Sequence, residues 1–118
     1  MSHARAHVRR MLKDWAIDGE LAHDIATVAT ELVTNAVRHC RVTLAEVEVV
    51  VSVRGCGVLV EVCDPDKEKV PAPRGGDAER DGGRGLVLVA ALSERWGPEA
   101  RPFTKCVWAY FVMPGREA

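Results

Sequence analysis

The chain has 118 residues, of which 47% are hydrophobic and 28% are charged, and its formal net charge at pH 7 is −1. A chain of this length and composition is expected to form one globular domain. The near-zero charge argues against nucleic-acid binding through a broad basic face, and no apolar run approaches the length of a membrane span. The basic N-terminal residues have no apolar core, so no secretory signal is predicted and the cytoplasm is the expected location.

Two helices are predicted in the first third of the chain. Apolar residues recur at intervals of three and four over 5–15, which is the period of a helix with one buried face. A break at 17–19 precedes a longer helical pattern over 21–39, which neither Gly nor Pro interrupts. These segments predict a pair of amphipathic helices.

A β-hairpin and a third helix are predicted next. Valines alternate with other residues over 47–53, a turn follows at 54–57, and a second strand is predicted over 58–63. The third helix is predicted over 85–95 and is ended by Trp96-Gly97-Pro98. Because this helix is apolar on most of its faces, we expect it to be well buried.

The last predicted element is a strand over 105–112, where apolar residues again alternate. Helices and strands are segregated along the chain, and the hairpin implies antiparallel pairing. We therefore expect an α+β fold, a two-layer sandwich with helices on one face of a small mixed or antiparallel sheet. No repeat or linker divides residues 1–118, so a single domain is expected.

Glycine and proline are concentrated in one segment. Half of the ten Gly and six Pro lie between Pro65 and Gly85, and a small domain rarely carries about 20 structureless residues without a use for them. The end of the segment, Asp81 to Leu86, opens the third helix. Glycines there would let backbone N–H groups approach an anion at a helix N-terminus, although a flexible connection is the simpler alternative. The pattern is neither a Walker loop nor a dinucleotide fingerprint.

The four cysteines show no metal-binding spacing. Cys40, Cys56, Cys63 and Cys106 form no C-x-x-C pair. Free thiols in a reducing compartment, buried or half-buried, are the expected state, with a zinc site or a catalytic thiol as the alternatives.

A polar stripe runs along the second predicted helix. Glu31, Asn35, Arg38 and His39 share one face at helical spacing, while the other faces are largely apolar. An ordinary solvent-facing stripe is the alternative, but Asn gains nothing on an exposed face in mid-helix. An amide oxygen is a suitable ligand for Mg²⁺, and a carboxylate one turn earlier can orient or deprotonate a hydroxyl group.

An aspartate ends the second predicted strand. Asp64 directly follows Cys63 and precedes Pro65. Its carboxylate could accept a hydrogen bond from an exocyclic amine, although an Asp that starts a turn before Pro is the simpler interpretation.

The order of these features resembles a known superfamily. The chain has, in order, a helix with Glu-x-x-x-Asn, a strand that ends in Asp, a Gly-rich helix start and a final strand. This order is similar to that in the ATP-binding domain of gyrase, heat-shock chaperones, histidine kinases and mismatch-repair proteins. The similarity is closest to the small bacterial branch of anti-sigma-factor serine kinases. The matching segments are ELVTNAVRH (31–39), DPDKEKVP (64–71), GGRGLVLV (82–89), SERWG (93–97) and KCVWAYFV (105–112). The resemblance implies a Bergerat-type ATP-binding fold.

The resemblance also implies roles for the polar residues. Asn35 would hold a Mg²⁺ ion that bridges the phosphates of ATP. Glu31 would be the catalytic residue, as a general base or as the group that orients the attacking hydroxyl. Asp64 would accept from the amino group of adenine, which selects adenine over guanine.

The phosphates would be held by the start of the third helix. Gly83 and Gly85 would offer backbone donors to them, and Arg84, Arg38 and His39 would add positive charge. Residues 65–84 would form the ATP lid. The apolar walls of the site would be Leu32, Ala36, Val62, Leu86 and Val107.

Three departures from the family pattern stand out. Asp64-Pro65-Asp66 lacks the Gly that usually comes two residues after the Asp. Cys106 is expected to stand where many members carry a Thr that supports the adenine contact, although Thr104 lies two residues earlier. The usual strand before the first helix is missing, so either the chain is truncated or its sheet lacks an edge strand.

The resemblance implies an ATP- and Mg²⁺-binding regulator similar to anti-sigma-factor serine/threonine kinases. Its partners would be a sigma factor, an anti-sigma antagonist whose Ser is phosphorylated, or both, with a homodimer plausible and with neither nucleic acid nor membrane as a partner. The alternative is a non-catalytic protein-binding module with a degenerate nucleotide pocket, motivated by the altered Gly box and by Cys106. A third option is the ATP-binding half of a split two-component kinase. This option is less favoured because the sequence shows no helix pair with a phospho-accepting His.

Overall fold

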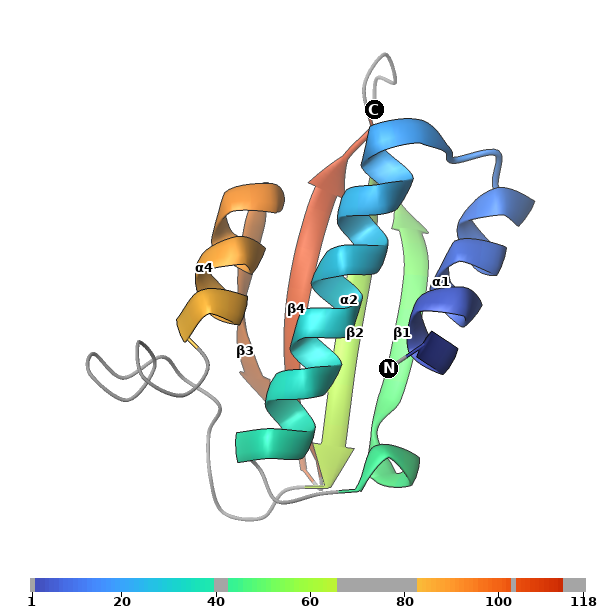
Figure 1. Ribbon diagram of the computed structural model, residues 1–118. Helices are drawn as coiled ribbons and strands as arrows, with labels where there is room; N and C mark the ends of the chain where they lie inside the picture. Colours follow the sequence, from blue (N-terminus) through green and yellow to red (C-terminus); the bar gives the residue numbers. More distant parts are fainter. Residues whose placement is uncertain (1, 40–42, 66–82, 103, 114–118) are drawn as a thin grey trace.

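The computed structural model describes residues 2–39, 43–65, 83–102 and 104–113. In this part of the chain, three helices cover one face of a four-stranded sheet whose strands are all antiparallel to their neighbours (Figure 1). The expected α+β, two-layer arrangement is therefore confirmed. None of the helices in these ranges is both long and apolar enough to cross a membrane.

Helices α1 (Ser2–Asp14) and α2 (Gly19–His39) pack against each other. Their contact buries the apolar stripes that the sequence predicts, since Val8 and Leu12 of α1 and Ile25 of α2 have no exposed surface. The chain reverses between them where Ala16 and Gly19 take positive φ angles of 59° and 71°. Both predicted helices are confirmed.

Strands β1 (Glu48–Arg54) and β2 (Gly57–Pro65) form the predicted hairpin. A single 3₁₀ turn, η1 (Leu44–Glu46), leads into β1 and was not predicted. It is closed by the side chain of Glu46, whose Oε1 accepts from the backbone N–H of Thr43 at 2.8 Å.

The sheet contains a strand that the sequence analysis missed. Helix α4 (Gly83–Leu92) is followed by β3 (Arg95–Ala100), so the prediction that Trp96-Gly97-Pro98 only ends a helix was wrong. The sheet order is β1-β2-β4-β3, with β4 (Thr104–Val112) in the interior and β3 at the edge. An edge strand tolerates Pro98 because one of its sides has no ladder hydrogen bonds to lose.

Helix α4 is less buried than expected. Val89 has no exposed surface, but Val87 is 67% exposed. The helix packs against α2 and β3 through one side only, so its apolar composition did not indicate burial on every face. The expectation of a well-buried third helix was wrong.

The two faces of the sheet differ in composition. Side chains alternate along a strand, so one set points at the helices and the other at the opposite face. The buried core residues on the helix side are Val51, Val58, Val60, Val62, Ala109 and Phe111. By the same alternation, Glu61 and Cys63 of β2 and Cys106, Trp108 and Tyr110 of β4 belong to the opposite face.

Two cysteines on this opposite face form a disulfide. Cys63 and Cys106 are direct partners in the register of β2 and β4, and their sulfurs are bonded across a sequence separation of 43. The expectation of free thiols was wrong for this pair, because strand pairing brings together two cysteines that no local spacing connects. Cys56 is a free, half-buried thiol, as expected, and Cys40 lies outside the described residues.

Candidate functional site

The predicted site residues come from elements that meet at one end of the fold. The C-terminal end of α2, the end of β2 and the N-terminal end of α4 all face the lower end of the view in Figure 1. Helix α2 packs against both α4 and β2. Glu31 and Asn35 on α2 and Asp64 at the end of β2 are therefore placed on the helix side of the sheet near this end.

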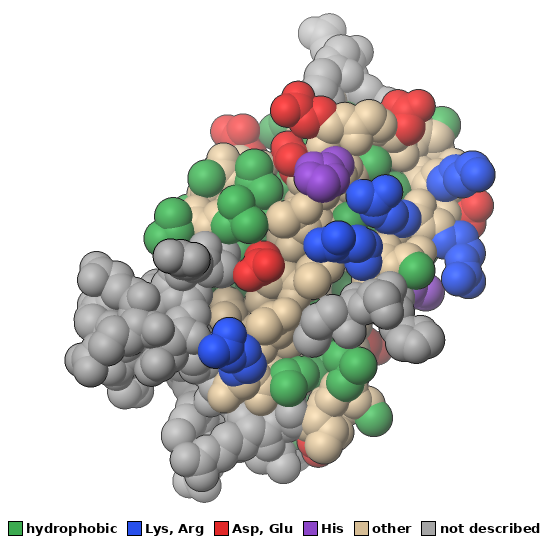
Figure 2. Space-filling view, in the orientation of Figure 1, with side chains coloured by type: hydrophobic (Ala, Val, Ile, Leu, Met, Phe, Trp, Pro, Cys, Tyr) green, Lys and Arg blue, Asp and Glu red, His purple; other side chains and the backbone are tan. Residues whose placement is uncertain are grey.

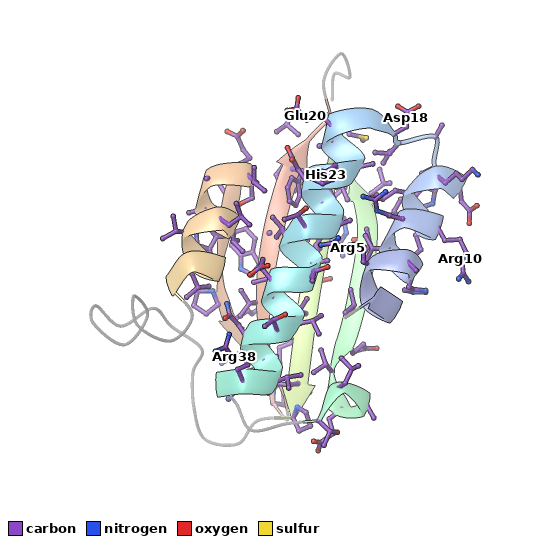
Figure 3. The ribbon with its side chains drawn as sticks, viewed as in Figure 1. Arg5, Arg10, Asp18, Glu20, His23 and Arg38 are labelled. Atoms are coloured by element: carbon purple, nitrogen blue, oxygen red, sulfur yellow. A yellow bond between two sulfur atoms is a disulfide. The ribbon has the colours of Figure 1, made fainter. Side chains whose placement is uncertain are left out.

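The polar stripe on α2 is only partly exposed. Glu31 and Asn35, one turn apart, are both half-buried, whereas Arg38 in the last turn is exposed (Figure 3). The backbone of His39 ends the helix, and its side chain lies outside the described residues. Glu31 and Asn35 are therefore not part of an ordinary solvent-facing stripe.

The amide nitrogen of Asn35, Nδ2, is buried without a hydrogen-bond partner among the described residues. An unsatisfied buried donor costs about 1–3 kcal/mol, so such groups usually mark a bound water or ligand. This donor is suited to a phosphate oxygen or to a water around a metal ion, and the amide oxygen of the same side chain is a Mg²⁺ ligand by type.

Asp64 lies beside a buried lysine. The Oδ1 atom of Asp64 is 4.0 Å from Nζ of Lys105, and only 4% and 3% of the two side chains are exposed. The two residues are direct partners in the register of β2 and β4. The strand end thus carries a charge pair rather than a solvated Asp that starts a turn.

Lys105 was missed by sequence reasoning as a candidate site residue. The available signal was the alternation of β4, which puts Lys105 on the same face as Val107, Ala109 and Phe111. That face is the helix side, where an unpaired lysine would be unusual. A charged residue at the first inward position of a core strand was therefore the clue.

Cys106 does not take the position that was expected for it. The sequence analysis placed it where a Thr would support the adenine contact, but Cys106 is bonded to Cys63 on the face of the sheet that the helices leave uncovered. Its neighbour Lys105 has the helix-facing position instead. The reason is the period of two in a strand, which sends adjacent residues to opposite faces.

The apolar residues expected to wall the site belong largely to the core. Leu32, Ala36 and Val62 are buried members of the core cluster, and Val107 packs against it. Leu86 on α4 is half-buried. These residues hold α2 and α4 on the sheet, and so position the polar groups at the end of the fold.

The predicted phosphate cradle is described only in part. The backbones of Gly83, Arg84 and Gly85 form the first turn of α4, and their side-chain surroundings lie outside the described residues. Most of the predicted lid does as well, because residues 66–82 are not described. The roles of these residues stay predictions.

The described surface also has pockets at the other end of the fold. Two pockets at the start of α2 are lined by residues such as Asp18, Glu20 and His23, which Figure 3 places at the end opposite Arg38. Figure 2 shows most of the visible Lys and Arg side chains over α1. Neither region contains a predicted site residue, and the described residues include no group of three His, Cys, Asp or Glu that could hold a metal ion.

Comparison with known proteins agrees with this geometry. Residues 1–111 match the family described as the histidine kinase-like ATPase domain. No curated protein gives a significant match. The match covers nearly the whole chain, including α2, the end of β2 and the start of α4. The chain therefore belongs to the histidine kinase-like ATPase domain family, and it is a nucleotide-binding, ATPase-like module.

Proposed function

We propose that this protein binds ATP with Mg²⁺ and acts as a regulatory serine/threonine kinase of the anti-sigma-factor type. The single observation that supports a working nucleotide site is the amide nitrogen of Asn35, which is buried without a hydrogen-bond partner among the described residues. Membership of the histidine kinase-like ATPase family supports nucleotide binding in general.

The proposed chemistry is phosphoryl transfer, in which positioning and charge neutralisation supply most of the rate. Asn35 would hold the Mg²⁺ ion, which neutralises phosphate charge when bound. Glu31, one helical turn earlier and half-buried, would accept the proton of the attacking hydroxyl. Asp64 would accept from the amino group of the base.

The proposed partners are a sigma factor, an anti-sigma antagonist that carries the acceptor Ser, or both. A homodimer belongs to the same proposal. Both rest on the resemblance of the segments ELVTNAVRH and GGRGLVLV to anti-sigma-factor kinases, and on membership of the wider family.

Calorimetry tests the site directly. The protein should bind ATP in the presence of Mg²⁺, and Asn35→Ala should abolish that Mg²⁺-dependent binding. The matched control is His23→Ala, which removes an exposed side chain from the same helix about 18 Å earlier along its axis. Binding that is equal in the protein and in Asn35→Ala would exclude Asn35 from the site.

A second candidate function is a protein-binding module that has lost its nucleotide site. The observation in its favour is the altered Gly box, in which Asp66 stands where the family pattern usually has Gly. A thermal-shift experiment separates the two, because a bound ligand at 100 times its Kd stabilises the fold by about 2.7 kcal/mol. A flat response to millimolar ATP with Mg²⁺ would favour the second function.

A further inference from the structure

We infer that Lys105 is a second base-recognition residue. Its ammonium group donates a hydrogen bond to the ring nitrogen N1 of adenine, while Asp64 accepts one from the neighbouring exocyclic amine. The inference rests on the proposed ATP binding and extends it, because it assigns base selection to two residues on adjacent strands. Nothing in the motifs at 31–39, 64–71 or 82–89 points to Lys105.

The placement of Lys105 is the first support. Lys105 and Asp64 are register partners on β4 and β2, and both point to the helix side, where α2 lies over the sheet. Their side chains are almost completely buried. The ammonium group is therefore at the same end of the fold as the residue that would read the exocyclic amine.

The unfilled hydrogen-bonding capacity of Lys105 is the second support. Its Nζ atom is buried and makes no hydrogen bond to any residue that the structure describes. Its contact with Asp64 is 4.0 Å long, which is an ion-pair distance and too long for a hydrogen bond. An ammonium group has three donors, so a buried one in this state is expected to meet an acceptor from a ligand or a water.

The third support is the match to the edge of adenine. That edge presents a donor, the exocyclic amine, next to an acceptor, the ring nitrogen N1. Asp64 and Lys105 present an acceptor next to a donor, which is the complementary order. Guanine bound in the same orientation would present the reverse order, with its carbonyl oxygen against the carboxylate, so the pair would disfavour it.

Base analogues test the inference without any change to the protein. In 1-deaza-ATP a C–H group replaces N1, whereas in 7-deaza-ATP the altered atom lies elsewhere on the base. Loss of a hydrogen bond to a charged donor should weaken binding about tenfold. We therefore expect 1-deaza-ATP to bind about tenfold more weakly than ATP and 7-deaza-ATP to bind like ATP. Equal binding of all three would overturn the role of Lys105.

A variant then assigns the effect to Lys105. In Lys105→Met the ratio of the Kd values for 1-deaza-ATP and ATP should fall to about one, because the donor to N1 is gone. The ratio cancels any loss of affinity that has another cause. Where this variant does not fold, Asp64→Asn combined with Lys105→Met leaves no buried charge and gives the same ratio. A ratio that stays near ten in either variant would overturn the inference.

The outcomes separate this inference from the proposed function. Binding of ATP without sensitivity to N1 leaves the ATP site in place and removes Lys105 from base recognition. No binding of ATP by the unaltered protein removes the proposed function, and the inference falls with it.

Discussion

The ammonium group of Lys105 lies 4.0 Å from the carboxylate of Asp64, with 3% and 4% of the two side chains exposed. Burial of two charges carries a desolvation cost that their mutual attraction offsets only while both are present. The pair joins β2 to β4 at the end of the fold where the predicted site residues gather. Each residue therefore constrains what can replace the other.

Removal of Lys105 alone should destabilise the fold strongly. Lys105→Met leaves the Asp64 carboxylate buried without its cation, which is expected to lower the free energy of unfolding by about 3–5 kcal/mol. Replacement of both, in Asp64→Leu with Lys105→Met, should recover most of that loss. Urea unfolding measures both effects, with Lys13→Met on the exposed face of α1 as the control, for which a change within about 0.5 kcal/mol is expected. If Lys105→Met lost no more than the control, the pair would not be an energetic unit.

The disulfide on the other face of the same strand pair should stabilise the fold. It closes a loop with a sequence separation of 43, for which the chain-entropy estimate is about 4 kcal/mol. Cys56→Ser removes the free thiol of the described residues, and Cys40→Ser removes the fourth cysteine of the chain. Urea unfolding of this double variant should shift to lower urea when a reductant is added. Addition of Cys63→Ser and Cys106→Ser should abolish that response. If the unfolding midpoint of the variant that keeps Cys63 and Cys106 did not depend on reductant, the disulfide between them would be contradicted.

Local patterns were sufficient for the elements that repeat one period without interruption. The 3.6-residue period of α2 and the alternation of β1 and β2 predicted those elements within a few residues. Strand β3 was missed because Gly97 and Pro98 are turn residues in most contexts. A strand accepts these two residues here because β3 lies at the edge of the sheet. Its edge position depends on how all the strands are ordered, which no local pattern reveals.

The candidate site divides in the same way. Asn35 was predicted because a helix makes neighbours of residues one turn apart, which spacing alone reveals. Lys105 was missed because its relation to Asp64 depends on the register between two strands about forty residues apart in the chain. The Thr position expected for Cys106 was wrong for a related reason, since adjacent residues of a strand point to opposite faces of the sheet.

A glycine at the start of β2 is expected to resist substitution. A Cβ atom on Gly57 would overlap the ring of Tyr110 and the carbonyl oxygen of Phe111, so Gly57→Ala should lower the free energy of unfolding by about 3 kcal/mol. Gly55→Ala in the adjoining turn is the matched control. Its Cβ would meet open space at a φ of 58°, for which we expect about 1 kcal/mol. Thermal or urea unfolding ranks the two variants, and an equal or reversed ranking would contradict the close approach at Gly57.

The role proposed for Glu31 predicts that its loss affects phosphoryl transfer but not ATP binding. Glu31→Gln keeps the size of a half-buried side chain but removes the carboxylate that would accept the hydroxyl proton. We expect ATP affinity to stay within about threefold, since the amide still fits, while the rate of phosphoryl transfer falls by about 10²–10⁴-fold. Calorimetry measures the first quantity, and transfer of labelled γ-phosphate to a Ser-containing partner, or to water, measures the second. Glu20→Gln at the exposed start of α2 is the matched control. Full transfer by Glu31→Gln would remove Glu31 from the mechanism, whereas loss of ATP binding would give it a role in holding the nucleotide instead.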